Sequence, residues 1–170
     1  MLQLDGVDDL THDDDVTLTL RVGQGLPLLG TDGELLSGQT FDVSPESEDV
    51  VAERAWIEDG VLHAAPFLLH LQIEVFGVRY VVALHHAHLR AALTFDGGLA
   101  DGYLGGAIPT AELLAVALTA DSRVGGDPFA AFFGPVLTRN ADLEPGADGK
   151  CTMLSGTFRF SAVSAFLFAE

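Results

Sequence analysis

Cysteine is almost absent from this sequence, which carries a single thiol at Cys151. One thiol cannot close a disulfide within the chain, so the fold does not depend on an internal disulfide framework. A zinc site built from several cysteine thiolates is excluded for the same reason. Stability must therefore come from a packed apolar core, for which 48% hydrophobic residues are sufficient.

Basic residues are also scarce, since 8 Lys and Arg face 25 Asp and Glu, giving a formal net charge of -17. Nucleic acids and anionic membrane surfaces are bound through clusters of Lys and Arg. We therefore expect no nucleic acid as a partner and no electrostatic attraction to an anionic membrane.

Long apolar runs are missing as well. The longest uncharged stretch, residues 60–73, contains two His and a Pro and is shorter than the ~20 apolar residues of a membrane-spanning helix. The sequence thus predicts no transmembrane segment. The start, Met1-Leu-Gln-Leu-Asp, lacks the basic and apolar regions of a signal peptide. A cytoplasmic protein and a mature domain cut from a longer precursor both fit this pattern.

Motifs of nucleophilic or nucleotide chemistry are absent too. The sequence has no Gly-x-Ser-x-Gly elbow, no Gly-x-Gly-x-x-Gly turn and no phosphate loop. The sequence contains no recognisable set of catalytic residues and therefore favours a protein that is not an enzyme.

Turn signals and alternating segments are what the sequence does contain. Six Asp-Gly pairs occur, and this dipeptide favours tight hairpin turns. Alternating apolar and polar residues predict strands at 16–22, 39–43, 50–58, 61–65, 67–75, 79–94, 99–107 and 157–169. In the hairpin around Asp59-Gly60, Trp56 is expected opposite His63.

The expected fold is mainly β: an antiparallel, hairpin-connected, barrel-like sheet or sandwich with one or two short helices. One helix is predicted over 111–120, and a second starts at Asp127-Pro128 and breaks at Gly134-Pro135. Residues 1–15 are expected to form an acidic leader that can be flexible, and 16–170 a single β-rich domain. Within that domain, 23–49 is a long irregular connection of the kind that is often functional or mobile.

The last predicted strand carries four phenylalanines on one face: Phe158, Phe160, Phe166 and Phe168. Such a concentration of aromatic side chains predicts a core position.

The first candidate site is a pair of histidines, His86 and His88. On a regular strand, residues two apart point to the same side, so both imidazoles could bind zinc or another transition metal. The hairpin partners expected for them, Gly105 and Ala107, are small and would leave room for a ligand. The same pattern also fits polar residues on a solvent-facing strand.

The second candidate site is an acidic loop with calcium-type spacing. Oxygen side chains occupy its positions 1, 3, 5 and 9: Asn140, Asp142, Glu144 and Asp148. The loop departs from an EF-hand at Pro145, where glycine is needed, and at Cys151, where a bidentate glutamate is needed. A weak calcium site and an acidic connecting loop are both compatible with it.

Several of these segments, in this order, resemble a group of uncharacterised secreted bacterial proteins and lipoproteins. The resemblance is carried by Asp59-Gly-Val-Leu, the segment 93–108, the following helix, the acidic loop 142–149 and the ending Phe158-Arg-Phe-Ser-Ala-Val. It implies an extracytoplasmic or cell-surface setting in the bacterial envelope or exterior, and brings no known activity.

Three functional hypotheses follow. The leading one is a non-enzymatic envelope or extracellular domain with a binding or structural role. The first alternative is a metal-dependent site, with or without enzymatic activity, that uses His86 and His88. The second is a β-barrel that carries a lipophilic ligand. A protein or a small lipophilic ligand is therefore the expected partner, and the sequence is also compatible with an oligomer.

Overall fold

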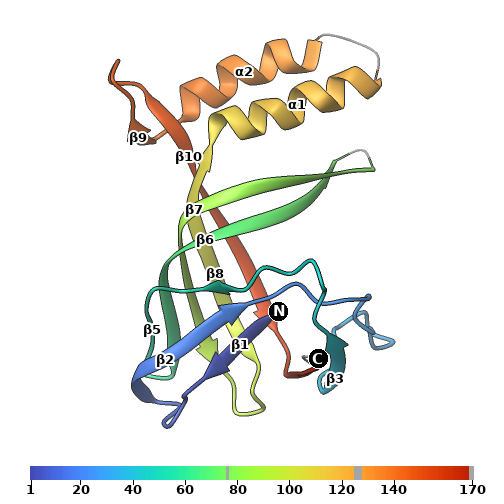
Figure 1. The fold of residues 1–170 in the computed structure, drawn as a ribbon, viewed down its shortest axis with the longest axis vertical. Coiled ribbons are helices and arrows are strands. Elements are labelled where there is room, and N and C mark those ends of the chain that lie inside the picture. Colours follow the sequence, from blue (N-terminus) through green and yellow to red (C-terminus); the bar gives the residue numbers. More distant parts are fainter. Residues whose placement is uncertain (76, 125–127, 169–170) are drawn as a thin grey trace. The chain divides into compact units, whose positions relative to one another are not determined.

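The computed structural model describes residues 1–75, 77–124 and 128–168. Over these residues the chain is mainly β, with a large antiparallel sheet and two helices, as the sequence predicts (Figure 1). The large sheet has the strand order β1-β2-β5-β6-β7-β8-β10-β9, with β4 beside β2, so it is open rather than a closed barrel. Strands β3 and β11 form a separate parallel pair.

The elements have the following bounds: β1 Leu2–Asp5, β2 His12–Leu20, β3 Gln39–Asp42, β4 Val50–Val51, β5 Ala55–Glu58, β6 Val61–Val75, β7 Val78–Leu93, β8 Leu99–Pro109, α1 Thr110–Val124, α2 Pro128–Asn140, β9 Leu143–Pro145, β10 Cys151–Ala162 and β11 Ala165–Phe168.

The chain forms two compact units. Unit 1 consists of Met1–Phe67, His88–Leu104 and Phe158–Glu170. Unit 2 consists of Leu68–Ala87 and Gly105–Thr157. Strands β6, β7, β8 and β10 each contribute residues to both.

The core of unit 1 lies on one face of β2, β5 and β6. Alternation buries Leu18 on β2, Ile57 on β5 and Leu62 on β6, all without solvent exposure. Ile57 and Leu62 are direct cross-strand partners. Both residues of the Asp59-Gly60 turn have positive φ, 52° and 75°, as a type I′ hairpin turn requires.

On the other face of this hairpin, Trp56 pairs with His63, which confirms the predicted register. The two rings are stacked, with centroids 5.0 Å apart and planes inclined by 8°. The guanidinium carbon of Arg54 lies 4.8 Å from the tryptophan ring centroid. This arrangement is typical of cross-strand packing, which is how the sequence analysis interprets the pair.

The prediction of a leader at 1–15 is wrong. Leu2 and Leu4 pair with Leu20 and Leu18 across β1 and β2, so the segment adds a strand to the sheet. The acidic side chains that suggested a solvated leader bind the turn between these strands. Asp13, for example, accepts hydrogen bonds from the backbone N–H groups of Asp8 and Asp15.

The prediction of one phenylalanine-rich core strand is also wrong. The segment divides into β10 and β11, and the side chains of Phe158, Phe166 and Phe168 are 42%, 66% and 63% exposed. The break at residues 163–164 ends the alternation on which the prediction relied, since β11 leaves the large sheet and pairs with β3.

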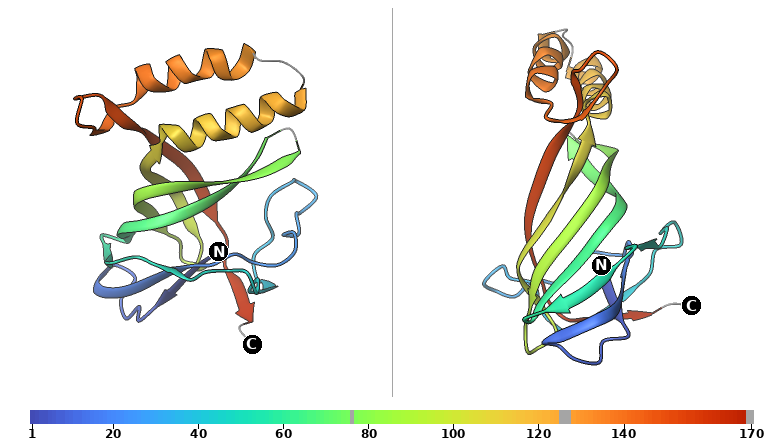
Figure 2. Two further views of the ribbon diagram at one scale, coloured as in Figure 1. Left: turned by 45° about the horizontal axis from the view of Figure 1, so that its top comes forward. Right: turned by 90° about the vertical axis from the view of Figure 1, so that its left-hand side faces the viewer.

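Unit 2 contains the two helices, which lie side by side in both views of Figure 2. Helix α1 is anchored by Glu112, whose carboxylate accepts a hydrogen bond of 2.8 Å from the backbone N–H of Ala83. Helix α2 starts at Pro128, as predicted, while the cap expected at Asp127 lies outside the described residues.

The predicted break at Gly134-Pro135 does not occur, because α2 continues to Asn140. Proline removes one helical hydrogen bond, but packing holds the helix through this point: Leu137 is buried, and Gly134 lies close to Leu114 of α1. No helix in the described part of the chain is long and apolar enough to cross a membrane.

Candidate functional site: a cavity in unit 1

Unit 1 contains a cavity of about 740 Å³. All of its lining belongs to unit 1 and comes from β1, the connection between β2 and β3, the β7–β8 turn and the segment from the end of β10 through β11. Apolar side chains dominate the lining: Met1, Leu2, Leu4, Pro27, Leu35, Leu36, Phe41, Leu93, Leu99, Val163, Phe166 and Leu167.

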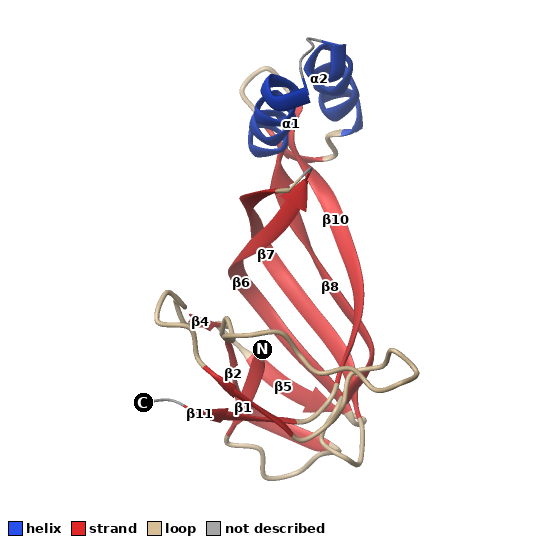
Figure 3. Ribbon diagram, turned by 90° about the vertical axis from the view of Figure 1, so that its right-hand side faces the viewer, coloured by secondary structure: helices blue, strands red, loops and turns tan. Residues whose placement is uncertain are grey.

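The connection 21–38, drawn as loop in Figure 3, forms part of this wall. The Gln39 side chain holds it in place. Its Oε1 accepts a hydrogen bond from the backbone N–H of Leu28, and its Nε2 donates to the carbonyl oxygens of Leu28 and Leu36. The amide thereby adds to the backbone pairing of the segment itself, which has an antiparallel bridge between Leu29 and Leu35 and a hydrogen bond from the N–H of Leu36 to the carbonyl oxygen of Leu28.

The parallel pair β3–β11 supplies a second wall. Phe41 lies beside Leu167, and Gln39 beside Ala165; all four residues line the cavity. Because side chains alternate along a strand, Thr40, Asp42 and Phe168 point to the opposite face. The face that carries Gln39, Phe41, Ala165 and Leu167 therefore borders the cavity, and Phe166 borders it as well.

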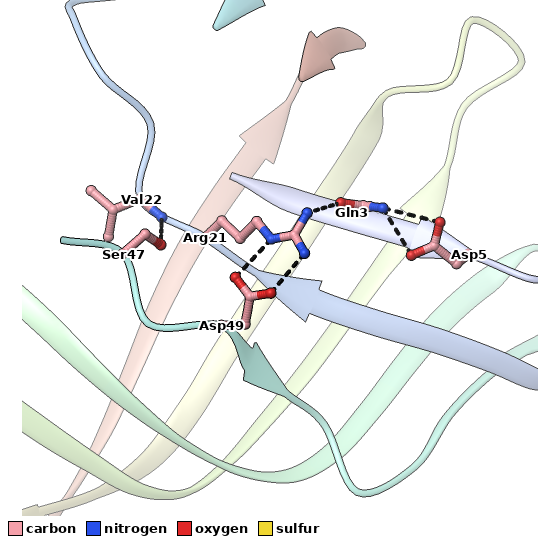
Figure 4. Close-up of polar contacts among 6 residues, drawn as sticks. All are labelled: Gln3, Asp5, Arg21, Val22, Ser47 and Asp49. Atoms are coloured by element: carbon pink, nitrogen blue, oxygen red, sulfur yellow. Dashed lines mark hydrogen bonds and ion pairs between the residues drawn. The ribbon is translucent and has the colours of Figure 1, made fainter. Parts of the chain in front are cut away.

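Two of the longer polar side chains of the wall, Arg21 and Gln3, bind other protein groups (Figure 4). Nε and Nη2 of Arg21 donate to the two carboxylate oxygens of Asp49, at 2.8 and 2.7 Å. Nη1 of Arg21 donates to Oε1 of Gln3, whose Nε2 donates to Asp5.

This network determines the electrostatic character of the wall. The hydrogen bonds from Arg21 lower the pKa of Asp49 and raise that of Arg21, so both groups are charged at neutral pH. The guanidinium charge is thus matched by a carboxylate, and its donors are occupied. An anionic ligand would have to compete with Asp49 for Arg21, whereas an uncharged apolar ligand needs only the apolar wall.

The structure does not present His86 and His88 as a regular strand pair. His86 has a φ of 47°, a left-handed conformation that interrupts strand alternation. Both side chains are exposed. In unit 2, Gly106 of β8 lies against Leu84 and the carbonyl oxygen of His85, which differs from the predicted pairing of His86 with Ala107.

The structure also does not gather the four residues of the predicted calcium loop around one point. Asn140 ends α2 and donates to the carbonyl oxygen of Val136. The Asp142 carboxylate accepts hydrogen bonds from the N–H and hydroxyl of Ser155. Asp148 accepts from the N–H of Lys150, and Glu144 is exposed on the short strand β9. Among the described residues, no three His, Cys, Asp or Glu side chains form a metal-binding group.

The Asp142–Ser155 contact leads to a testable prediction. Hydrogen bonds from Ser155 lower the pKa of Asp142, so the ionised carboxylate stabilises the folded chain. We expect Asp142→Asn to lower the melting temperature by a few degrees at pH 7. That difference should be full above the ordinary aspartate pKa of about 3.9 and should vanish as the pH falls through the lower folded-state value.

Melting curves of both proteins between pH 7 and pH 2.5, each with and without millimolar calcium, measure this difference. Glu144→Gln is the matched control, because the Glu144 carboxylate has no hydrogen-bond partner in the part of the chain that the structure describes. A loss in Asp142→Asn that appears only when calcium is present would show that Asp142 binds the cation instead of holding Ser155.

The residues that build the cavity, chiefly Gln3, Arg21 and Gln39, are not among those predicted from the sequence. One signal was available, because Leu2 and Leu4 alternate with polar residues in a segment interpreted as a leader. The Gln39 contacts had no local signal, since they depend on where residues 28 and 36 lie in space. Comparison of this chain with protein-family models, with curated proteins and with solved structures finds no match.

Proposed function

We propose that this chain is a binding module and that the cavity of unit 1 holds an uncharged, apolar ligand. The observation that carries the proposal is the apolar lining of a cavity of about 740 Å³, a volume within the range of sites for small molecules. The proposal keeps the lipophilic ligand of the sequence analysis but places it beside an open sheet instead of inside a barrel.

The chemistry of the wall supports an apolar ligand. The side chains of Gln39 and Arg21 are engaged in hydrogen bonds that hold the wall together. Arg21 is the charged side chain in the lining, and its guanidinium is paired with Asp49; the amino group of Met1, which also lines the cavity, donates to the carbonyl oxygen of Arg21. The favourable free energy of binding would come from removing apolar surface from water.

A neutral fluorescent probe, N-phenyl-1-naphthylamine, tests the proposal. We expect saturable binding of one probe per chain with enhanced emission. In Ala165→Trp, an indole would enter the cavity from the inner face of β11, and we expect the affinity to fall at least about tenfold.

Ala111→Trp adds the same side chain at an exposed position of α1, outside the cavity, and should bind the probe like the unmodified protein. Equal affinities for Ala165→Trp and Ala111→Trp would show that the probe binds elsewhere and would refute the proposal.

A further inference from the structure

Strand β11 has a free edge. Within the described residues it pairs with β3 alone. The carbonyl oxygens of Ser164 and Phe168 point toward β3, where they accept hydrogen bonds from Gly38 and Val43. Backbone groups alternate in direction along a strand, so the N–H and C=O groups of Ala165 and Leu167 point away from β3. They form a short row of donors and acceptors that another strand can use.

The face of this small sheet that carries Phe168 and Asp42 is aromatic and acidic. On β11, Phe168 is 63% exposed and is not part of the cavity lining, whereas Phe166, 66% exposed, also lines the cavity. Asp42 is the register partner of Phe168 on β3. The chain from residue 22 to residue 51, which leads into and out of β3, has six acids and no Lys or Arg: Asp32, Glu34, Asp42, Glu46, Glu48 and Asp49.

We propose that the free edge of β11 is a docking site for an extended segment of a partner protein, which adds a strand beside Ala165–Phe168. Main-chain hydrogen bonds to a sheet edge supply affinity, and alternate side chains supply specificity. The segment that fits here has an apolar residue against Phe168, and Lys or Arg alternating with or flanking it. The inference goes beyond the proposed function, because the cavity lining does not include Phe168.

Charge complementarity distinguishes this partner from a second copy of the chain. Two copies would bring two chains of net charge -17 together. Like charges placed together across an interface are strongly disfavoured. A basic segment is attracted by the same net negative charge that repels a second copy, and its binding should weaken as salt screens the charges.

A labelled peptide of alternating lysine and valine is a suitable probe, with a peptide of alternating glutamate and valine as its acidic counterpart. Fluorescence anisotropy should show at least about tenfold tighter binding of the basic peptide at low salt. Phe168→Thr should weaken that binding about tenfold, because an aromatic contact is lost while a strand-forming residue is kept. Phe95→Thr removes a fully exposed aromatic side chain from a turn and should change nothing.

Hydrogen exchange of the unmodified protein measures the same contact without a substitution. The basic peptide should protect the amides of Ala165 and Leu167. Protection confined to other strands, or equal weakening by Phe168→Thr and Phe95→Thr, would overturn the proposal. So would sedimentation data showing that the chain forms a dimer that protects β11 without any peptide, because the occupant would then be a second copy.

Discussion

Replacing Ile57 by alanine is expected to destabilise the protein by about 2–5 kcal/mol. Ile57 has no solvent exposure and lies in the centre of β5, the strand that pairs with both β2 and β6. Its register partner on β6, Leu62, is equally buried. Truncation would therefore remove apolar contacts and leave a space that the paired strands can only partly fill.

Two further variants make the prediction quantitative. Ile57→Val removes one methyl group and should cost about 0.5–1.5 kcal/mol. Val51→Ala also truncates an aliphatic side chain, but on β4, where Val51 is 53% exposed. This substitution should cost less than about 0.5 kcal/mol.

Urea unfolding, followed by the emission of the only tryptophan, Trp56, and by far-ultraviolet circular dichroism, measures these changes. Trp56 is stacked on His63 within unit 1, so its emission reports on the strands that hold Ile57. If Ile57→Ala and Val51→Ala had the same unfolding midpoint, the assignment of the core to this face of β2, β5 and β6 would be wrong.

The same strands show why part of the fold can be predicted from sequence. The hairpin of β5 and β6 depends on local signals: alternation on both sides and an Asp-Gly turn that tolerates positive φ at both residues. Register then follows from the turn, and Trp56 lies opposite His63 as expected. The fold class and the start of α2 depend on equally local chemistry.

Local signals compete at two places. Asp101-Gly102 has the composition of a turn, yet the predicted strand 99–107 runs through it, and the structure confirms that strand as β8. Gly102 is needed there because the ring of Phe160 approaches within 2.6 Å of where a Cβ would lie. The acids of residues 5–15 suggest a leader, and that prediction is wrong because Leu2 and Leu4 pair with β2, a contact distant in sequence.

The candidate site was harder to predict than the fold. The histidine hypothesis assumes an unbroken strand, and the positive φ of His86 could not be inferred from its neighbours. The cavity depends on an irregular connection held by Gln39 and on β11 leaving the large sheet. Neither feature produces a periodic pattern of apolar residues in the sequence. The composition therefore indicates an excess of apolar residues but does not indicate where in the fold they line a cavity.

Replacing Gly106 by alanine is the second substitution with a large expected effect, about 1–3 kcal/mol of destabilisation or more. A Cβ at this position would lie 2.7 Å from Cγ of Leu84 and 2.9 Å from the carbonyl oxygen of His85. Leu84 is completely buried in unit 2, and the carbonyl belongs to the strand backbone. Neither group can move away without disturbing β7 next to the irregular residue His86.

The neighbouring glycine provides the matched control. A Cβ at Gly105 would meet its nearest atoms, the carbonyl oxygen of Gly156 and the hydroxyl of Thr157, at 3.5 and 3.6 Å, which are ordinary contact distances. Gly105→Ala should therefore be neutral or stabilising by up to about 1 kcal/mol, because alanine loses less backbone entropy on folding. Thermal melts of the two variants measure the contrast. If the two variants had equal melting temperatures, an added methyl group would be tolerated at both positions. The approach of β7 and β8 at Gly106 would then be less close than the structure places it.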